Sequence, residues 1–540
     1  MKRSRHLLTL FAFLLLISIL SIGGCNSNNG QSIPQEIRAI FNKALYDGSV
    51  WALRVVDLDT GEIIYDQSSD DKLFIASVRK VFTTGEALQA LGEEHMFRTP
   101  IHRQGLVDEE DVLEGDLILL ATGDFTMGGR RLPNNTMDIV DFDHNEADVF
   151  GNAELTTPNP LQGYKDLAKQ IVDSGVKRIT GEIIVDDRLF QPYFFRNQYD
   201  IRPIFVNDDL VDVIVDPGEP GVPAVVDWRP KSAAFDVESS VQTLSTGMIN
   251  TIEVDPFLPE CFGTEGCMGD VVGDISVDAV SPLTQEFPIV QVFRITDPSS
   301  YARTVLIEAL IEEGIQIDAP IVAENPSQLL PPKNSYTPNT ILAELVSLPF
   351  PQYEKLVLKV SYNIGAETSL LLWGLTQGVD NMDDALELER DNLTQNVGIP
   401  SDDFSFVDGS GGGQTKATAK AVIQMLEHIS KQSFFPHYLQ LLPILAVDGT
   451  LSFVTDFEAD PTLAGAKGNV FAKTGTFAEG DETGIILRGR GLAGYIDAKS
   501  GRRLMFSVIV NNVAIGEDIQ GLFTVSQDQG TISAIIWRDN

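Results

Sequence analysis

Residues 77–80 read Ser77-Val78-Arg79-Lys80 and stand at the head of a stretch whose apolar residues recur with helical spacing. If Ser77 opens this helix, Lys80 lies one turn later on the same face, within reach of the serine hydroxyl. A serine hydroxyl is a weak nucleophile at neutral pH and needs a neighbouring base to take its proton. The stretch therefore predicts a nucleophilic Ser77, activated by Lys80, on a helix that Gly92 ends.

Two further motifs follow in a fixed order along the chain. They are Ser361-Tyr362-Asn363 in its middle and Lys473-Thr474-Gly475-Thr476 near its end. Each motif alone is common by chance, but the ordered trio is typical of serine enzymes that acylate on D-alanyl peptides or β-lactams. We expect Ser361 and Asn363 to supply a proton relay and an amide that holds the substrate. The later strand would offer a cation, hydroxyls and backbone donors to a substrate carboxylate.

A wider likeness is carried by segments outside these tripeptides. They are Leu113–Leu117 with Gly123-Asp124, Leu167–Phe190, Pro217–Val225, Asp297–Gly314, Ser361–Glu367, Asp408–Gly411 and Asp448–Leu451. Over most of residues 50–515 the chain resembles the D-Ala-D-Ala carboxypeptidase/endopeptidases of the low-molecular-mass class C penicillin-binding proteins, peptidase family S13. Three departures stand beside the likeness. Gly412-Gly413-Gln414 follows the D-G-S-G run, Thr126–Asn159 is long, and about a dozen extra residues after Thr476 predict a longer loop.

The resemblance implies a serine DD-carboxypeptidase or DD-endopeptidase that cuts D-Ala-D-Ala or cross-linked stem peptides of peptidoglycan through a Ser77 acyl-enzyme. Its partners would be those stem peptides and β-lactams. The backbone amides of Ser77 and Thr476 would form the oxyanion hole. No metal or cofactor is expected, because lysine serves as the base. The longer loop beside the K-T-G strand leaves substrate selectivity open.

The distance between the first two motifs decides the domain organisation. In compact relatives these motifs lie much closer, so the chain must leave the catalytic domain and return to it. We expect an α+β, transpeptidase-like domain of the penicillin-binding-protein/β-lactamase type, an antiparallel sheet flanked by helices, built from residues 26–98 and 331–540. Residues 99–330 would form one or two inserted domains, with two preferred, and Pro331-Pro332 would mark the re-entry.

The N-terminus has the pattern of an export signal. Basic residues precede an apolar run from Leu7 to Ile22, which is too short and wrongly flanked for a spanning helix. Gly23-Gly24-Cys25 resembles a bacterial lipobox, so residues 1–25 are predicted to be a lipoprotein signal peptide with a lipidated Cys25. The alternative is ordinary cleavage with Cys25 as a bystander. We expect an exported protein, lipid-anchored outside the cytoplasmic membrane, in the periplasm or at the outer membrane.

Charge, cysteines and one acidic run add narrower expectations. The net charge of −38 argues against nucleic acid and against a surface that rests on an anionic membrane. Cys261 and Cys267 are predicted to form a local disulfide, with free thiols as the alternative. Asp141–Asn145 resembles the start of a calcium loop but lacks its later glycine and glutamate. A solvated acidic loop is therefore expected there.

Two other functions remain open from the residues alone. A β-lactamase shares the three motifs but turns over its acyl-enzyme quickly, and the long segment between the motifs disfavours it. An inactive, cell-wall-binding lipoprotein would carry a vestigial serine site, but every catalytic position is filled. Labelling by penicillin separates the DD-peptidase, the β-lactamase and the inactive cell-wall-binding protein.

Overall fold

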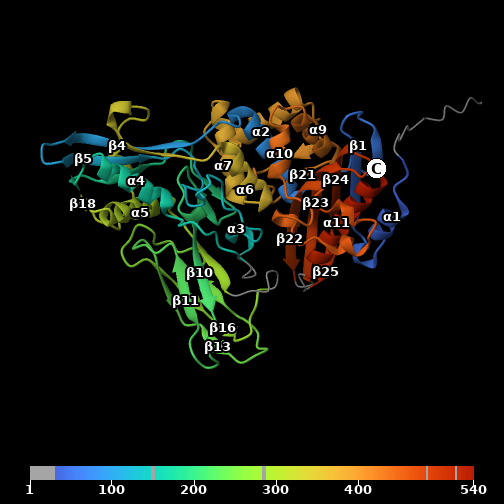
Figure 1. Cartoon of the computed structure of the whole chain (residues 1–540), viewed down its shortest axis with the longest axis horizontal. Helices are drawn as coiled ribbons and strands as arrows, with labels where there is room; N and C mark the ends of the chain where they lie inside the picture. The colour runs from blue at the N-terminus through green and yellow to red at the C-terminus, as the bar shows by residue number, and fades with distance from the viewer. Residues whose placement is uncertain (1–30, 148–152, 282–287, 482–483, 517–519) are drawn as a thin grey trace, which may run out of the picture.

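The computed structural model describes residues 31–147, 153–281, 288–481, 484–516 and 520–540. The predicted signal peptide and Cys25 lie outside these residues. Within them, no helix has the length and apolar character needed to cross a membrane. The two ends of the described chain lie close together, beside the sheet that carries the red strands in Figure 1.

An antiparallel sheet in the order β2-β1-β24-β23-β22 joins the beginning of the chain to its end. Its strands are β1 (Val50–Asp57), β2 (Ile63–Gln67), β22 (Val470–Asp481), β23 (Gly484–Asp497) and β24 (Arg503–Asn511), with β25 (Val513–Gly516) paired to β23. The first two strands pair in antiparallel fashion as a hairpin. Because β1 pairs with β24 along its whole length, residues more than four hundred positions apart share one sheet.

Both faces of this sheet are covered, so its strands are apolar on both sides. Ala52 and Val56 of β1 belong to one core, and Trp51, Leu53 and Val55 belong to the other. This alternation follows from the two-residue period of a strand. The first core is completed by α2 (Lys80–Leu91), α6 (Phe350–Lys359), α7 (Asn363–Thr376), α8 (Met382–Asn392), α9 (Ala419–Ser430) and α10 (Phe435–Leu441). The second is completed by α1 (Gln35–Phe41) and α11 (Gln520–Asp539).

The part of the chain between the first two motifs has a separate apolar core, built from residues between Ile101 and Leu345. Figure 1 shows the sheet and helices of this part at a distance from the first sheet. The sheet of this part has the order β18-β6-β5-β4-β19, with β7 paired to β5. The strands are β4 (Arg98–Val107), β5 (Val112–Leu120), β6 (Arg178–Ile179), β7 (Ile183–Asp186), β18 (Gln316–Ile317) and β19 (Ile341–Val346). Helices α4 (Gln162–Asp173) and α5 (Pro298–Glu312) contribute to this core.

The rest of the insert is rich in short strands. They are β8 (Tyr193–Phe195), β9 (Tyr199–Ile201), β10 (Leu210–Asp216), β11 (Val225–Arg229), β12 (Asp236–Ser239), β13 (Gln242–Leu244), β14 (Glu253–Asp255), β15 (Met268–Val272), β16 (Asp274–Ser276) and β17 (Ile289–Arg294). They form small two- and three-stranded sheets. Cys261 and Cys267 are joined by a disulfide in this part, with an S–S distance of 2.08 Å.

One sequence expectation needs correction, and one strand pairing bears on the domain boundary. β19, which follows Pro331 in the chain, pairs with β4 and places Leu345 opposite Thr99. An unpaired β4 edge would leave its backbone groups without partners, and β19 covers it. The extra residues after Thr476 form a longer hairpin rather than a loop, since β22 and β23 stay paired from Thr476–Arg490 out to Asp481–Gly484.

Candidate active site

Ser77 lies at the point where the chain turns from a short strand, β3 (Leu73–Phe74), into α2. A 3-10 turn over Ala76–Arg79 runs directly into the helix. The φ of Ala76 is 47°, a strained value for a residue with a side chain, and it fixes the direction of the turn. Lys80 Nζ lies 2.9 Å from Ser77 Oγ, and the Lys80 side chain is fully buried. The helical geometry expected of residues 77–80 is therefore present.

The Nζ atom of Lys80 connects three distant segments of the chain. Its Nζ lies 2.6 Å from Asn363 Oδ1, 3.4 Å from Ser361 Oγ and 3.0 Å from the Ser410 carbonyl oxygen. The serine of the S-Y-N motif has a φ of 68°, which turns the chain just ahead of α7. The structure thus brings Ser361 and Asn363 to the Ser77–Lys80 pair. The Ser410 carbonyl could not be predicted from the sequence as a partner of Lys80, because every residue carries a backbone carbonyl.

A buried carboxylate holds the loop that supplies this carbonyl. Glu367 accepts hydrogen bonds from the Gly409 and Ser410 amides at 2.8 and 2.9 Å. Burial and the neighbouring Asp408 charge raise the pKa of Glu367 to about 7. Asp408 in turn accepts from the Gly411 amide at 2.7 Å. The D-G-S-G loop is therefore fixed by two carboxylates that lie close to each other.

A buried ion pair anchors the same loop to the nucleophile turn. Arg79 forms an ion pair with Glu389 at 2.5 Å, and both side chains are buried. Its Nε donates to the Asp408 carbonyl at 3.0 Å, and its guanidinium lies over the Phe406 ring at 4.2 Å. Sequence analysis did not single out Arg79 or Glu389, although the arginine lies inside the first motif.

The K-T-G strand, β22, is the edge strand of the sheet and passes directly beside the nucleophile turn. Thr474 Oγ1 bonds to Thr450 Oγ1 at 2.8 Å. Lys473 is fully buried, and its Nζ donates to the Thr474 carbonyl at 2.8 Å. A Cβ added at Gly475 would lie 2.3 Å from the Ile75 carbonyl oxygen and 2.9 Å from Ser77 N. Only glycine lets the strand approach the serine this closely.

Substitution of Gly475 tests this close approach. We expect Gly475→Ala to lower kcat/KM for acylation by about 100-fold, because a shift of about 1 Å at the serine misaligns the attack. Gly480→Ala is the matched control, since a Cβ added at Gly480 on the same strand meets no atom within 4 Å. Rates of acylation by a chromogenic penicillin measure the effect. Equal rates for the two variants would contradict a tight contact at Gly475.

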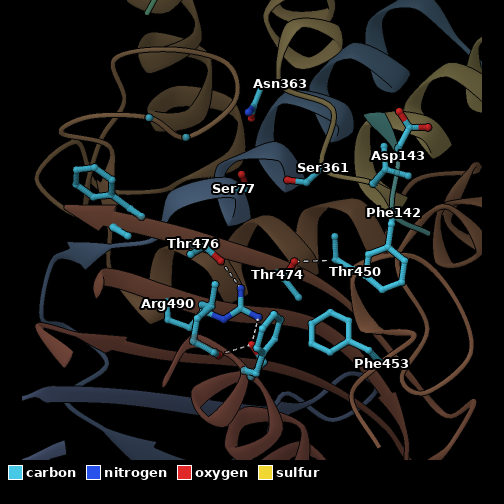
Figure 2. A pocket seen from close by; sticks show the side chains of 18 of the residues that line it. Ser77, Phe142, Asp143, Ser361, Asn363, Thr450, Phe453, Thr474, Thr476 and Arg490 are labelled. Carbon is cyan, nitrogen blue, oxygen red and sulfur yellow. Dashed lines mark hydrogen bonds between the residues drawn. The ribbon is translucent and has the colours of Figure 1, made fainter. Parts of the chain in front are cut away.

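These groups open into a cavity of about 580 Å³. Figure 2 shows Ser77, Ser361 and Asn363 on one side, with Thr474 and Thr476 on the strand across from them. Asp141, Phe142 and Asp143 of the inserted segment line another part of the wall. Lys80 and Lys473 are not lining residues, so both lie behind the surface that a substrate would touch.

The acidic run behind Phe142 is a buried cluster, and the predicted solvated loop is wrong. Arg130 donates to both carboxylate oxygens of Asp143 at 2.6 and 2.8 Å and to Asp208 at 2.5 Å. His144 lies 2.9 Å from Asp208 and 2.6 Å from Asp212. Burial opposes the imidazolium, but these carboxylates outweigh it and raise the pKa of His144 to about 10.

The same cluster bears on metal binding. Ligand atoms of Asp143, His144 and Asp208 lie within 4.8 Å of one another, so they could surround an ion. However, the Arg130 guanidinium already bridges the two carboxylates. The positive charge that balances these carboxylates therefore comes from Arg130, a residue of the protein itself. The cluster as a whole supports the wall of the cavity.

The family model for the D-Ala-D-Ala carboxypeptidase 3 (S13) family matches residues 34–522. The chain belongs to this family. The predicted class, a serine D-Ala-D-Ala carboxypeptidase, is thereby confirmed at the level of the S13 family.

Relatives of this S13 protein match over most of its length. It is 23% identical over 514 residues to a D-alanyl-D-alanine carboxypeptidase from an Actinomadura species, covering 89% of this chain and 81% of the relative. It is 24% identical over 490 residues to the D-alanyl-D-alanine carboxypeptidase DacB of Haemophilus influenzae, covering 88% of each. The crystal structure of penicillin-binding protein 4 from Haemophilus influenzae matches with a TM-score of 0.66 at 20% identity, over 91% of this chain and 98% of that one. The predicted α+β, multidomain fold class is confirmed.

Proposed function

We propose that this S13 protein is a penicillin-binding DD-carboxypeptidase/DD-endopeptidase in which Ser77 is the nucleophile and Lys80 the general base. One observation carries the proposal: Lys80 Nζ lies 2.9 Å from Ser77 Oγ and 2.6 Å from Asn363 Oδ1, directly behind the cavity wall that Ser77 and Asn363 line. A base must be within hydrogen-bond reach of the proton it removes, and this pair meets that condition.

The reaction is a two-step acyl transfer. Ser77 Oγ forms a bond to the carbonyl carbon of the penultimate D-alanine as its proton passes to Lys80 Nζ. The backbone amides of Ser77 and Thr476 stabilise the oxyanion that develops. The carbon–nitrogen bond then breaks, and the leaving amine takes a proton through Lys80 and Ser361. Water then attacks the resulting ester as one of its protons passes to Lys80 Nζ, the ester carbon–oxygen bond breaks, and Lys80 returns the proton to Ser77 Oγ.

Side chains around the cavity orient the substrate. Asn363 would hold the amide of the stem peptide, and Thr474 and Thr476 would bind the carboxylate next to the scissile bond. Lys473 would act from behind Thr474, since it is fully buried. With a β-lactam ring the first of these steps gives an ester on Ser77, and the leaving amine stays attached to the acyl group, which favours a slowly released adduct.

The placement of the enzyme in the cell belongs to the proposal as well. Cys25, directly after Gly23-Gly24, would carry a lipid that tethers the protein outside the cytoplasmic membrane. Peptidoglycan lies there, so the anchor would keep the cavity near its substrate. We assign residues 26–98 and the chain after β19 to the catalytic domain, and the segment from β4 through β19 to the insert.

Treatment of the intact protein with penicillin and, separately, with a peptide ending in D-Ala-D-Ala tests the proposal. We expect one penicilloyl adduct by intact-mass measurement, located on the peptide that contains Ser77, together with release of D-alanine. Rapid turnover to hydrolysed penicillin without an adduct would instead indicate a β-lactamase. Neither adduct nor D-alanine would indicate a cell-wall-binding protein. Digestion of cross-linked muropeptide dimers then measures the endopeptidase share.

A further inference from the structure

Arg490 is a cation buried at the floor of the catalytic cavity. Strand β23 places it opposite Thr476, and it is 5% exposed where it lines the cavity. Its Nη1 donates to Thr476 Oγ1 at 2.5 Å and to the Gly475 carbonyl at 3.3 Å, while Nη2 donates to Ser526 Oγ at 3.0 Å. Figure 2 shows the guanidinium directly beneath Thr476. Arg490 lies within the extra residues that separate Thr476 from Gly494.

The guanidinium has only neutral partners. Among the described residues no carboxylate lies within 4 Å of it, and its Nε has no hydrogen-bond partner. Burial alone lowers the pKa of Arg490 to about 10. Three other buried arginines differ, since Arg79, Arg130 and Arg303 each pair with a carboxylate. A buried charge without a counterion is unfavourable, so an anion that arrives in the cavity would gain by approaching Arg490.

The hydrogen bond to Thr476 sets the direction of its hydroxyl proton. A threonine hydroxyl has one donor hydrogen and two acceptor positions. Arg490 Nη1 occupies an acceptor position, so the hydrogen of Thr476 must point elsewhere. Thr476 is exposed to the cavity, which makes a cavity-bound anion a suitable acceptor. The arginine therefore both orients the donor and supplies a positive potential behind it.

We propose that Arg490 is a positioning residue that, through Thr476, makes the enzyme selective for substrates with a free carboxylate next to the scissile amide. This inference rests on the proposed function and deepens it. Lys473 donates to the Thr474 carbonyl from within the protein, whereas Arg490 lines the cavity itself. Peptides whose corresponding carboxyl group is amidated would be poor substrates.

The test compares an acylated D-Ala-D-Ala peptide with the same peptide ending in a carboxamide. The wild type should prefer the free acid. Arg490→Gln should lower kcat/KM for the free-acid peptide by about 10- to 100-fold, which is the range expected for loss of a hydrogen bond to a charged partner. The kcat/KM for the carboxamide peptide should change much less. Arg488→Gln is the matched control on the same strand, because Arg488 pairs with Glu479 at 2.7 Å and does not line the cavity. It should retain the wild-type acid-to-amide ratio.

The acid-to-amide ratio separates this role from a structural one. An equal loss on both substrates, or an unchanged ratio, would overturn the inference. If Arg490→Gln does not fold, Ser526→Ala decides, since it removes one anchor of the guanidinium and should lower the same ratio by a smaller factor. A wild type that neither releases D-alanine nor forms a Ser77 adduct would count against the proposed function instead. An active wild type with no preference for the acid would count against the Arg490 role alone.

Discussion

Ser77→Ala is expected to abolish penicillin labelling and to lower D-alanine release by about five to six orders of magnitude. In the proposed reaction the Ser77 oxygen is the atom that bonds to the substrate, so its removal leaves no group to form the acyl-enzyme. Ser361 Oγ lies 3.4 Å from Lys80 Nζ, farther than the 2.9 Å of Ser77. Intact-mass measurement after incubation with penicillin, with an assay for free D-alanine, gives both readouts.

A second serine in the site provides the matched control for this substitution. Ser410 reaches Lys80 through its carbonyl rather than its side chain. Its hydroxyl accepts a 3.3 Å hydrogen bond from Arg196 and is not directed at Lys80, so Ser410→Ala should keep penicillin labelling close to that of the wild type. Persistent labelling of Ser77→Ala, at any residue in the cavity, would contradict the assignment of the nucleophile.

The sequence was sufficient for the parts of the site that depend on short spacing and ordered motifs. Ser77 and Lys80 are three residues apart in a helical turn, so backbone geometry alone brings them together. Ser361, Asn363 and Lys473 follow from the order of the motifs, and the structure gathers Ser361 and Asn363 around Lys80. The catalytic sheet could also be anticipated, because the strands at both ends of the chain carry clear apolar patterns.

Other parts depend on partners that no local pattern reveals. The acidic run at Asp143 appeared solvated because Arg130 and Asp208, which bury it, lie elsewhere in the chain. The pairing of β19 with β4 joins residues more than two hundred positions apart, such as Leu345 and Thr99, so no local pattern predicts it. Arg490 was hidden for the same reason, since its importance appears only when β23 places it opposite Thr476.

Lys80→Met is expected to lower the rate of acylation by penicillin by about a thousand- to ten-thousand-fold, the usual contribution of a general base. Methionine is unbranched and of similar length, so it fills much of the space that the buried lysine side chain occupies. With the base removed, the remaining reaction of Ser77 depends on hydroxide. The residual rate of the variant should therefore rise about tenfold for each pH unit, in contrast to the wild type.

Lys80→Arg distinguishes a base from a fixed charge at the same position. Arginine keeps the positive charge next to Ser77 and Asn363 but does not release its proton in proteins. If Lys80 acts only through its charge, this variant should acylate nearly as fast as the wild type. If Lys80 takes the proton of Ser77, as its 2.9 Å contact implies, the arginine variant should be as slow as Lys80→Met. Second-order rates of penicillin acylation, measured for the three proteins between about pH 6 and pH 10, separate the two roles.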